Sequence, residues 1–256
     1  MHWPRGLGPP VRAGGGASGP RPDYRWRSDF GISLDGSSNV QSWTDSIQAA
    51  VISQGTAGNR PGYTASDPTF NGAPSVTMTG KFLQSVDSEA RWRFLAEESS
   101  TMVIVNRRTG NPAGVISLLI YAGADGNPAR VGICDYYAPG TPDVTYAKIT
   151  NGAGYTRDLG IAFGGSGVPN WKAIRNDPDN SQLRLQLSGG VDTGWSAYTG
   201  AAPLGALSST FFLGYTNPSF SFVGECVDVA FFNRVLSDGE LAAYVAKMVA
   251  LYGATP

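Results

Sequence analysis

Closely spaced turn signals divide this chain into many short apolar runs, and this pattern restricts its fold most. The chain contains 34 glycines and 17 prolines, and turn pairs such as Asn151-Gly152 and Gly189-Gly190 fall between the runs. Nine runs have the length and composition of strands: residues 75–79, 101–105, 115–121, 131–134, 144–149, 159–163, 182–187, 210–215 and 223–232. At least nine strands in about 200 residues predict an all-β sandwich or jelly roll.

Three of these runs also indicate how deeply their strands are buried. The stretch Leu183–Leu187 alternates apolar and polar residues, which predicts a strand with one buried face. The stretches 115–121 and 227–232 are apolar at odd and even positions alike. Such strands need cover on both faces, so we expect them at the centre of a sheet.

Two segments are predicted to be helical. The first is Ser88–Ser99, in which apolar residues recur at helical spacing. The second is residues 237–252, which begins with a capping box formed by Ser237 and Glu240 and stops before Gly253. Six apolar or aromatic residues fall on one face: Leu241, Tyr244, Val245, Met248, Leu251 and Tyr252. We expect this amphipathic helix to dock on the sandwich, with the methionine and tyrosines in the core.

An N-terminal arm, residues 1–22, precedes the domain predicted for residues 23–256. Eleven of these 22 residues are Gly or Pro, and none is acidic. The arm is a disordered tail or an expression remnant, or else an extended segment that becomes ordered on a partner. In the second case Gly14–Gly19 is a hinge. The residues expected to contact a partner are then Trp3, Arg5, Leu7, Arg12 and Arg21.

The overall charge argues against nucleic-acid and membrane partners. The chain has 19 basic and 20 acidic residues, so it lacks the positive field that attracts DNA or an anionic membrane. Without the arm, 16 basic and 20 acidic residues remain, a net charge of −4. No stretch approaches the roughly 18–20 apolar residues of a membrane helix, and the N-terminus lacks the apolar core of a secretion signal. Cys134 and Cys226 leave the redox compartment open.

Five stretches of sequence together resemble the concanavalin A-like, laminin-G-like jelly-roll domains of bacterial and phage structural proteins. They are Trp26–Gly36, Val40–Asp45, Gly55–Tyr63, Asn71–Leu83 and Gly224–Glu240. The last has the strand, the Asn-Arg-x-Leu-Ser turn and the helix start with which such domains usually end. The resemblance extends over about residues 24–253 and implies two antiparallel sheets with about 12–14 strands. This fold carries lectins, glycosidases and inert structural domains, so the resemblance does not fix an activity.

Catalytic motifs are missing from the domain. Laminarinase relatives of the wider fold carry Glu-x-Asp-x-x-Glu on one strand, and none of the five glutamates here has that context. Glu225 and Asp228 are three residues apart, so a regular strand would place them on opposite faces. The one histidine, His2, lies in the arm, which excludes His-based nucleophile systems and zinc sites from the domain. We therefore predict no catalytic residues, and a glycosidase with an unrecognised site is the remaining enzymatic alternative.

No metal or cofactor site is predicted. Asp125-Gly126-Asn127 and Asp177–Asn180 offer oxygen ligands suited to calcium. Turns favour the same residue types for their own hydrogen bonds, and we interpret both segments as turns. Gly164–Gly167 lacks the lysine of a phosphate-binding loop and is interpreted as a plain loop.

Aromatic residues in polar, loop-like contexts are the candidates for glycan binding, because aromatic faces stack on sugar rings and anchor protein interfaces. They are Tyr136, Tyr137, Trp171, Trp195 and Tyr198. The alternative for each is a place in the core or as a lid, which we expect for Trp26, Trp43 and Trp92 and which extends to Trp195.

Three functions follow from these features. The first is a non-enzymatic structural protein of a phage particle: a capsid decoration protein, head fibre or tail appendage. Its arm would bind capsid or tail subunits, its domain would display a lectin-like face, and homo-oligomers would fit this role. Such a protein is made in the host cytoplasm and located in the virion. The second is a carbohydrate-binding module, with or without calcium, and the third is a glycoside hydrolase.

Overall fold

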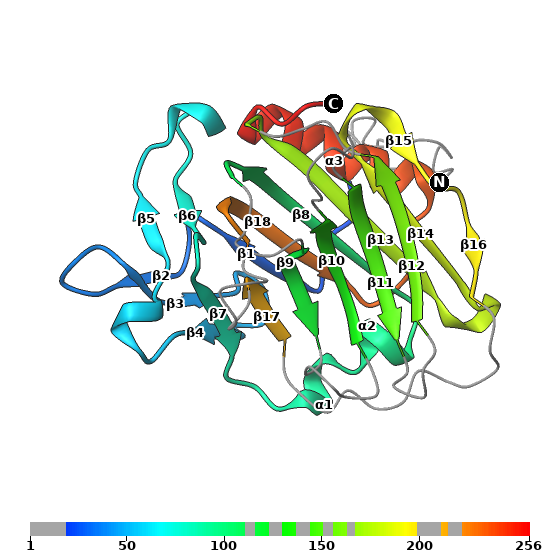
Figure 1. The fold of residues 1–256 in the computed structure, drawn as a ribbon, viewed down its shortest axis with the longest axis horizontal. Helices are drawn as coiled ribbons and strands as arrows, with labels where there is room; N and C mark the ends of the chain where they lie inside the picture. The colour runs from blue at the N-terminus through cyan, green and yellow to red at the C-terminus, as the bar shows by residue number, and fades with distance from the viewer. Residues whose placement is uncertain are drawn as a thin grey trace, which may run out of the picture.

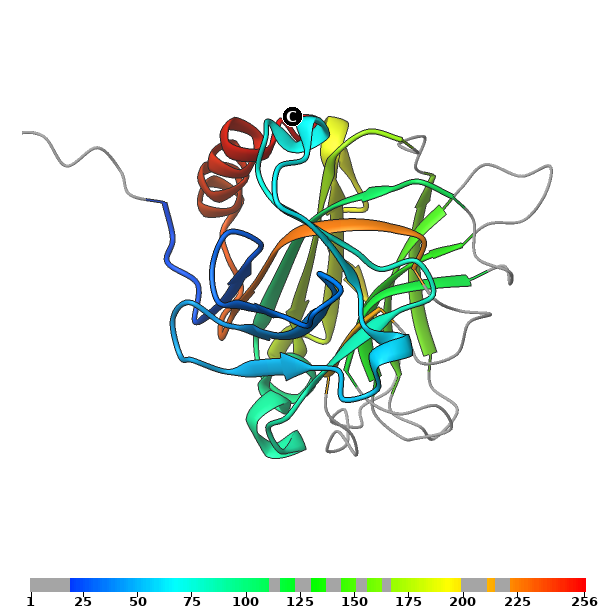
Figure 2. The ribbon, with the colours of Figure 1, turned by 90° about the vertical axis from the view of Figure 1, so that its left-hand side faces the viewer.

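The fold is described from a computed structural model. It describes residues 19–110, 116–122, 130–136, 144–150, 156–162, 167–198, 211–214 and 222–256. Two antiparallel sheets stack face to face within these ranges, and one long helix covers the outside of the first sheet (Figures 1 and 2). The predicted two-sheet antiparallel sandwich with a C-terminal helix is therefore confirmed.

The first sheet contains nine strands within the described residues, and its main path runs β15-β14-β13-β8-β18-β6-β5. The strand β1 also pairs with β18, and β16 pairs with β14. Their bounds are β1 Tyr24–Arg27, β5 Gly62–Thr64, β6 Ser75–Thr77, β8 Ser100–Arg108, β13 Asn170–Asp177, β14 Gln182–Leu187, β15 Val191–Asp192, β16 Ser196–Ala197 and β18 Gly224–Phe232.

The second sheet also contains nine strands in the described ranges, in the order β12-β11-β10-β9-β17-β7-β4-β3-β2. Their bounds are β2 Ile32–Leu34, β3 Val40–Thr44, β4 Val51–Ser53, β7 Phe82–Ser85, β9 Ile116–Ala122, β10 Arg130–Tyr136, β11 Val144–Thr150, β12 Thr156–Ala162 and β17 Phe211–Gly214. Short 3-10 turns join some of these elements: η1 Ala57–Asn59, η2 Pro68–Phe70, η3 Pro178–Asn180 and η4 Ser188–Gly190.

The central strands β8 and β18 are buried on both faces, as the apolar run 227–232 predicts for β18. Met102 and Ile104 of β8 point into the core between the sheets, whereas Val103 and Val105 point outward beneath the helix. A bulge between Cys226 and Asp228 shifts the register of β18 against β8. The apolar run 227–232 thus supplies side chains to two cores at once.

The C-terminal helix α3, Asp238–Tyr252, has the ends that the sequence predicts. The Ser237 hydroxyl accepts a hydrogen bond from the Glu240 backbone N–H, and the Glu240 carboxylate accepts one from the Ser237 backbone N–H. Gly253 closes the helix in the left-handed conformation at φ 64°. The buried face of α3, which includes Tyr244 and Met248, packs on the first sheet. Helix and sheet thus form a second apolar core outside the sandwich. The place predicted for Leu251 on the buried face is wrong, because its side chain is 49% exposed.

The helix predicted over Ser88–Ser99 is shorter and divided. It consists of α1 Glu89–Trp92 and α2 Phe94–Glu97, separated at Arg93. The adjacent residues Phe94, Leu95 and Ala96 are all buried. Burial on consecutive positions leaves no solvent face for a longer amphipathic helix, and β8 starts at Ser100.

The core position predicted for three tryptophans is confirmed. Trp26, Trp43 and Trp92 are fully buried. Cys134 lies on β10 and Cys226 on β18, in different sheets, and no disulfide joins them. No helix among the described residues has the length and apolar character needed to span a membrane.

Candidate functional site

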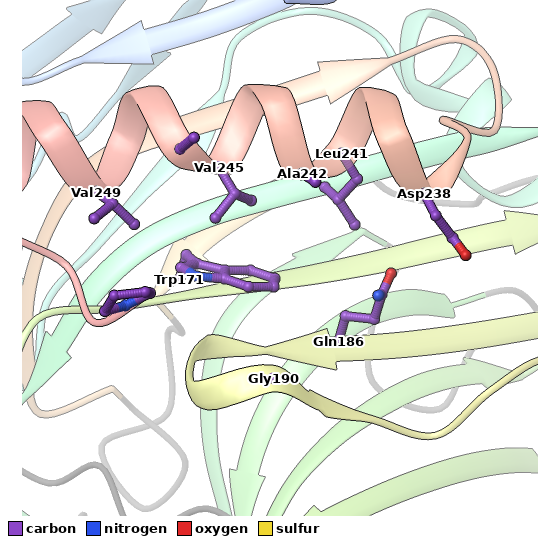
Figure 3. A pocket seen from close by; sticks show the side chains of 10 residues that line it. Trp171, Gln186, Gly190, Asp238, Leu241, Ala242, Val245 and Val249 are labelled. Atoms are coloured by element: carbon purple, nitrogen blue, oxygen red, sulfur yellow. The ribbon is translucent and has the colours of Figure 1, made fainter.

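A cleft lies between α3 and the β14–β15 hairpin, on the outer side of the first sheet (Figure 3). Its volume is about 450 Å³, within the range of small-ligand sites. We call it the α3 cleft. Its lining consists of Trp171, Gln186, Gly190, Asp238, Leu241, Ala242, Val245, Ala246, Val249 and Pro256.

The α3 cleft is apolar along most of its length and polar at one end. Leu241, Val245 and Val249 descend from the helix toward the Trp171 ring, and Asp238 faces Gln186 at the other end (Figure 3). Trp171 is 8% exposed, and its indole N–H has no hydrogen-bond partner among the described residues. An unpaired buried donor is unusual in folded proteins.

The polar end of the cleft continues into a group of alternating charges beneath an exposed tryptophan. We call it the Trp195 cluster: Trp195, Arg175, Arg184, Asp192 and Asp238. The guanidinium carbons of Arg175 and Arg184 lie 5.2 Å and 5.9 Å from the centroid of the Trp195 ring. Arg184 Nε donates to Asp192 Oδ1 at 2.9 Å, and Asp238 Oδ1 lies 2.6 Å from Arg175 Nη2. Trp195 itself is 37% exposed.

Mutual pairing keeps the cluster ionised. The hydrogen bond from Arg184 holds the pKa of Asp192 below its ordinary value, and the hydrogen bond from Arg175 does the same for the pKa of Asp238. Two arginines face two carboxylates, so the cluster has no net formal charge. It presents donors, acceptors and one aromatic ring to a ligand.

Local structure fixes each member of the cluster. Arg175 leaves the outer face of β13, and its Nη1 donates to the Leu236 carbonyl at 2.8 Å just before α3. Asp192 is in β15, opposite Gln186 of β14. Asp238 is the first residue of α3, where the helix dipole favours a carboxylate. The strand, the hairpin and the helix start thus converge on Trp195.

A buried ion pair, separate from the Trp195 cluster, lies inside the sandwich. No sequence pattern predicts it. Lys172 of β13 is fully buried, and its ammonium lies 2.6 Å from both carboxylate oxygens of Asp135 on β10. Thr145 of β11 donates to the same carboxylate at 2.6 Å. Burial lowers the pKa of Lys172, and the Asp135 carboxylate opposes that shift. The pair joins the two sheets through their interior.

The five predicted glycan-binding aromatics do not form one exposed surface. The exposure expected for Trp171 and Tyr198 is wrong: they are 8% and 6% exposed. Trp171 belongs to the central strand β13, whose outer face lies beneath α3, and not to a loop. Trp195 remains accessible. Tyr136 ends β10, with its side chain outside the described set, and Tyr137 lies outside the described residues.

The predicted arm and turn residues have separate outcomes. Trp3, Arg5, Leu7 and Arg12 lie outside the described residues, as does the turn at 125–127, while Arg21 is described and lies in the wall of a second pocket.

Asp177 caps η3, and its carboxylate accepts from Asn180 Nδ2 at 2.8 Å, which agrees with the turn interpretation. No group of three or more His, Cys, Asp or Glu side chains is placed to hold a metal within the described ranges.

Solved structures with a similar fold include sialidases. The Trypanosoma rangeli sialidase in complex with 2,3-difluoro-KDN gives a TM-score of 0.59 at 17% identity over 95% of this chain and 34% of that chain. The K499G mutant of NanB sialidase from Streptococcus pneumoniae gives 0.51 at 14% identity over 66% and 27%. The CBM40 of the Ruminococcus gnavus IT-sialidase bound to α2,3 sialyllactose gives 0.49 at 20% identity over 60% and 85%.

The likeness to the two sialidases concerns the fold alone, because both identities are low. The chain spans about one third of the T. rangeli sialidase that it matches. No protein-family model matches the chain, and no curated protein matches it by sequence. The role in a phage particle is tested by none of these comparisons and stays a prediction.

Proposed function

We propose that this chain is a carbohydrate-binding domain without catalytic activity, and that it binds sugar at the Trp195 cluster. The observation that carries the proposal is the partly exposed Trp195 ring, supported from beneath by Arg175 and Arg184. A ring fixed in this way offers its free side to the apolar face of a sugar at little cost in side-chain entropy.

The surrounding groups suit a hydroxylated ligand. Arg184 and Gln186 are donors, and Asp192 and Asp238 are acceptors, and hydrogen bonds and ion pairs within the cluster hold these groups in place. A small number of fixed polar groups beside an aromatic ring is the usual composition of a specific ligand site. Because the cluster has no net formal charge, we expect an uncharged sugar and a binding constant that changes little with salt.

The likeness in fold adds modest support. The T. rangeli sialidase, with a TM-score of 0.59, is in complex with a nononic acid derivative. The match covers about one third of that sialidase and concerns the fold, so the position of the site rests on the Trp195 cluster alone.

The non-catalytic part of the proposal rests on the sequence. The domain has no histidine, and its five glutamates do not occur as paired carboxylates in a glycosidase motif. Incubation with polysaccharides is expected to release no reducing sugar. Release that is lost on substitution of one carboxylate would replace this part of the proposal with a hydrolase.

Glycan-array screening followed by calorimetry on the best neutral glycan tests the binding part. Trp195→Ala is expected to weaken binding about tenfold or more, since an aromatic contact is worth about 1 kcal/mol beyond its buried area. The matched control is Phe30→Ala, which removes an aromatic ring that is 50% exposed and does not belong to the Trp195 cluster.

Three results would overturn the binding proposal: no glycan bound on the array, equal affinity of the Trp195→Ala and wild-type proteins, or equal losses in the Trp195→Ala and Phe30→Ala proteins. Thermal melting of each variant separates a lost contact from a lost fold.

A further inference from the structure

A second pocket lies on the other side of α3, where the base of the N-terminal arm meets the helix and β1. Its volume is about 250 Å³, and we call it the arm pocket. Figure 2 shows the chain leaving the body beside α3. A Cβ added to Gly19 would lie 3.3 Å from Lys247 Nζ, so the arm passes close to the helix here. The lining consists of Gly19, Pro20, Arg21, Pro22, Arg25, Arg27, Ser46, Ile47, Tyr244, Lys247 and Met248.

The lining contains four cationic side chains and no acidic one. Arg25 is already paired with the buried Asp228, at 2.6 Å. Arg27 pairs with Asp29 on the surface, where both side chains are more than one third exposed and the pair contributes little. Arg21 and Lys247 are exposed, and no carboxylate of the described residues pairs with either. The pocket therefore has positive charge that the described residues do not compensate.

Two buried donors of the lining also lack partners. Tyr244 is 2% exposed, and its hydroxyl forms no hydrogen bond with the described residues. The buried Nε–H of Arg27 is likewise unpaired in that part of the chain. Unsatisfied donors of this kind are costly unless a water, an ion or a ligand completes them. Burial raises the pKa of Tyr244 well above its ordinary value, so the hydroxyl keeps its proton.

We propose that the arm pocket binds an oxyanion, the sulfate, phosphate or carboxylate group of a small ligand. Arg21 and Lys247 supply the charge, and Tyr244 Oη and Arg27 Nε donate to the anion oxygens. Charge-assisted hydrogen bonds to such oxygens are the strong ones. This site is separate from the Trp195 cluster and does not depend on it.

Titration of the full chain with inorganic sulfate, followed by calorimetry or NMR shifts, tests the proposal. Glucose 6-sulfate and glucose are parallel ligands that distinguish a free anion from the anionic group of a sugar. We expect sulfate or glucose 6-sulfate to bind and glucose to leave this pocket unaffected. The Arg21→Gln/Lys247→Gln double variant should lose this binding, and Tyr244→Phe should weaken it about tenfold.

The matched control is Lys81→Gln/Arg93→Gln, which removes the same charge from residues outside the arm pocket. It should bind the anion as the wild type does. The proposal is wrong if neither anion binds, or if both double variants weaken binding equally, because the effect would then be one of net charge. It is also wrong if Tyr244→Phe, folded by thermal melting, binds the anion with unchanged affinity.

Discussion

Two groups of ion pairs in this protein use the same chemistry in opposite surroundings. Lys172 and Asp135 join the two sheets inside the sandwich, where both side chains are at most 2% exposed. Arg184 pairs with Asp192 and Asp238 at the rim, where the side chain of Asp238 is 66% exposed. Water has been removed from the first pair and still reaches the second. The interior pair should therefore matter for stability, and the rim pairs for what the protein binds.

The largest effect is expected from Lys172→Met. This change leaves the Asp135 carboxylate buried without its cation, and breaking a buried pair in this way costs about 3–5 kcal/mol in the free energy of unfolding. Urea denaturation measures the loss. The Lys172→Met/Asp135→Leu double variant should recover part of it, because no isolated charge then remains. Wild-type stability of the single variant would show that the pair is not buried as described.

The next largest effect on stability is expected from one of two tyrosines of α3 and not from the other. Tyr252 donates to the buried Asp228 carboxylate at 2.8 Å, whereas the Tyr244 hydroxyl has no partner among the described residues. Tyr252→Phe should lower the free energy of unfolding by about 2 kcal/mol, since the carboxylate loses a donor. Tyr244→Phe is the matched control and should be neutral or slightly stabilising, as read from denaturant midpoints. Equal losses in the two variants would show that the hydrogen bond from Tyr252 to Asp228 is not the cause, because both changes keep the ring.

Substitution in the Trp195 cluster is expected to affect glycan binding more than stability, whereas substitution of the interior pair affects stability. Arg184→Gln removes two partly exposed ion pairs and should change the free energy of unfolding by about 1 kcal/mol or less. The same change should weaken glycan binding at the Trp195 cluster severalfold, because the ring loses one of its two supporting cations. Denaturation and calorimetry on one preparation give both numbers. A large loss of stability with unchanged glycan binding would contradict the binding role that we assign to the Arg184 ion pairs.

The sequence predicts best where the determining residues are neighbours in the chain. Ser237, Glu240 and Gly253 define α3 through contacts within a few residues, and the apolar run 227–232 indicates cover on both faces. Trp171 was misassigned because the polar residues on both sides of it were interpreted as a loop, whereas the pairing of β13 with β8 places it in a covered sheet.

Local sequence patterns cannot predict the buried ion pairs, because the partners are far apart in the chain. Lys172 and Asp135 are 37 positions apart, and Arg25 and Asp228 are 203 apart. Only the stacking of the two sheets and the pairing of β1 with β18 bring them together. The Trp195 cluster depends in the same way on the docking of α3 beside the hairpin. The aromatic residue was recognisable in the sequence, but its supporting charges were not.

The smallest expected effect is the dependence of stability on acidic pH, and it arises from the exposed Glu240 carboxylate. The hydrogen bonds from Arg234 and from the Ser237 backbone lower the pKa of Glu240 from 4.5 to about 2. A depressed carboxylate pKa stabilises the folded state above the unfolded value, and that contribution is lost as the pH falls through the folded value. The melting temperature should therefore decrease between about pH 5 and about pH 2.

Glu240→Gln should make this decrease shallower while keeping most of the stability at neutral pH, because glutamine also forms the capping box but does not titrate. Melting curves of both proteins at several pH values measure the difference. An equally steep decrease in the variant would assign the acid sensitivity to other carboxylates, such as Asp35, whose pKa is also lowered to about 2 by backbone hydrogen bonds from Asn39 and Ser37.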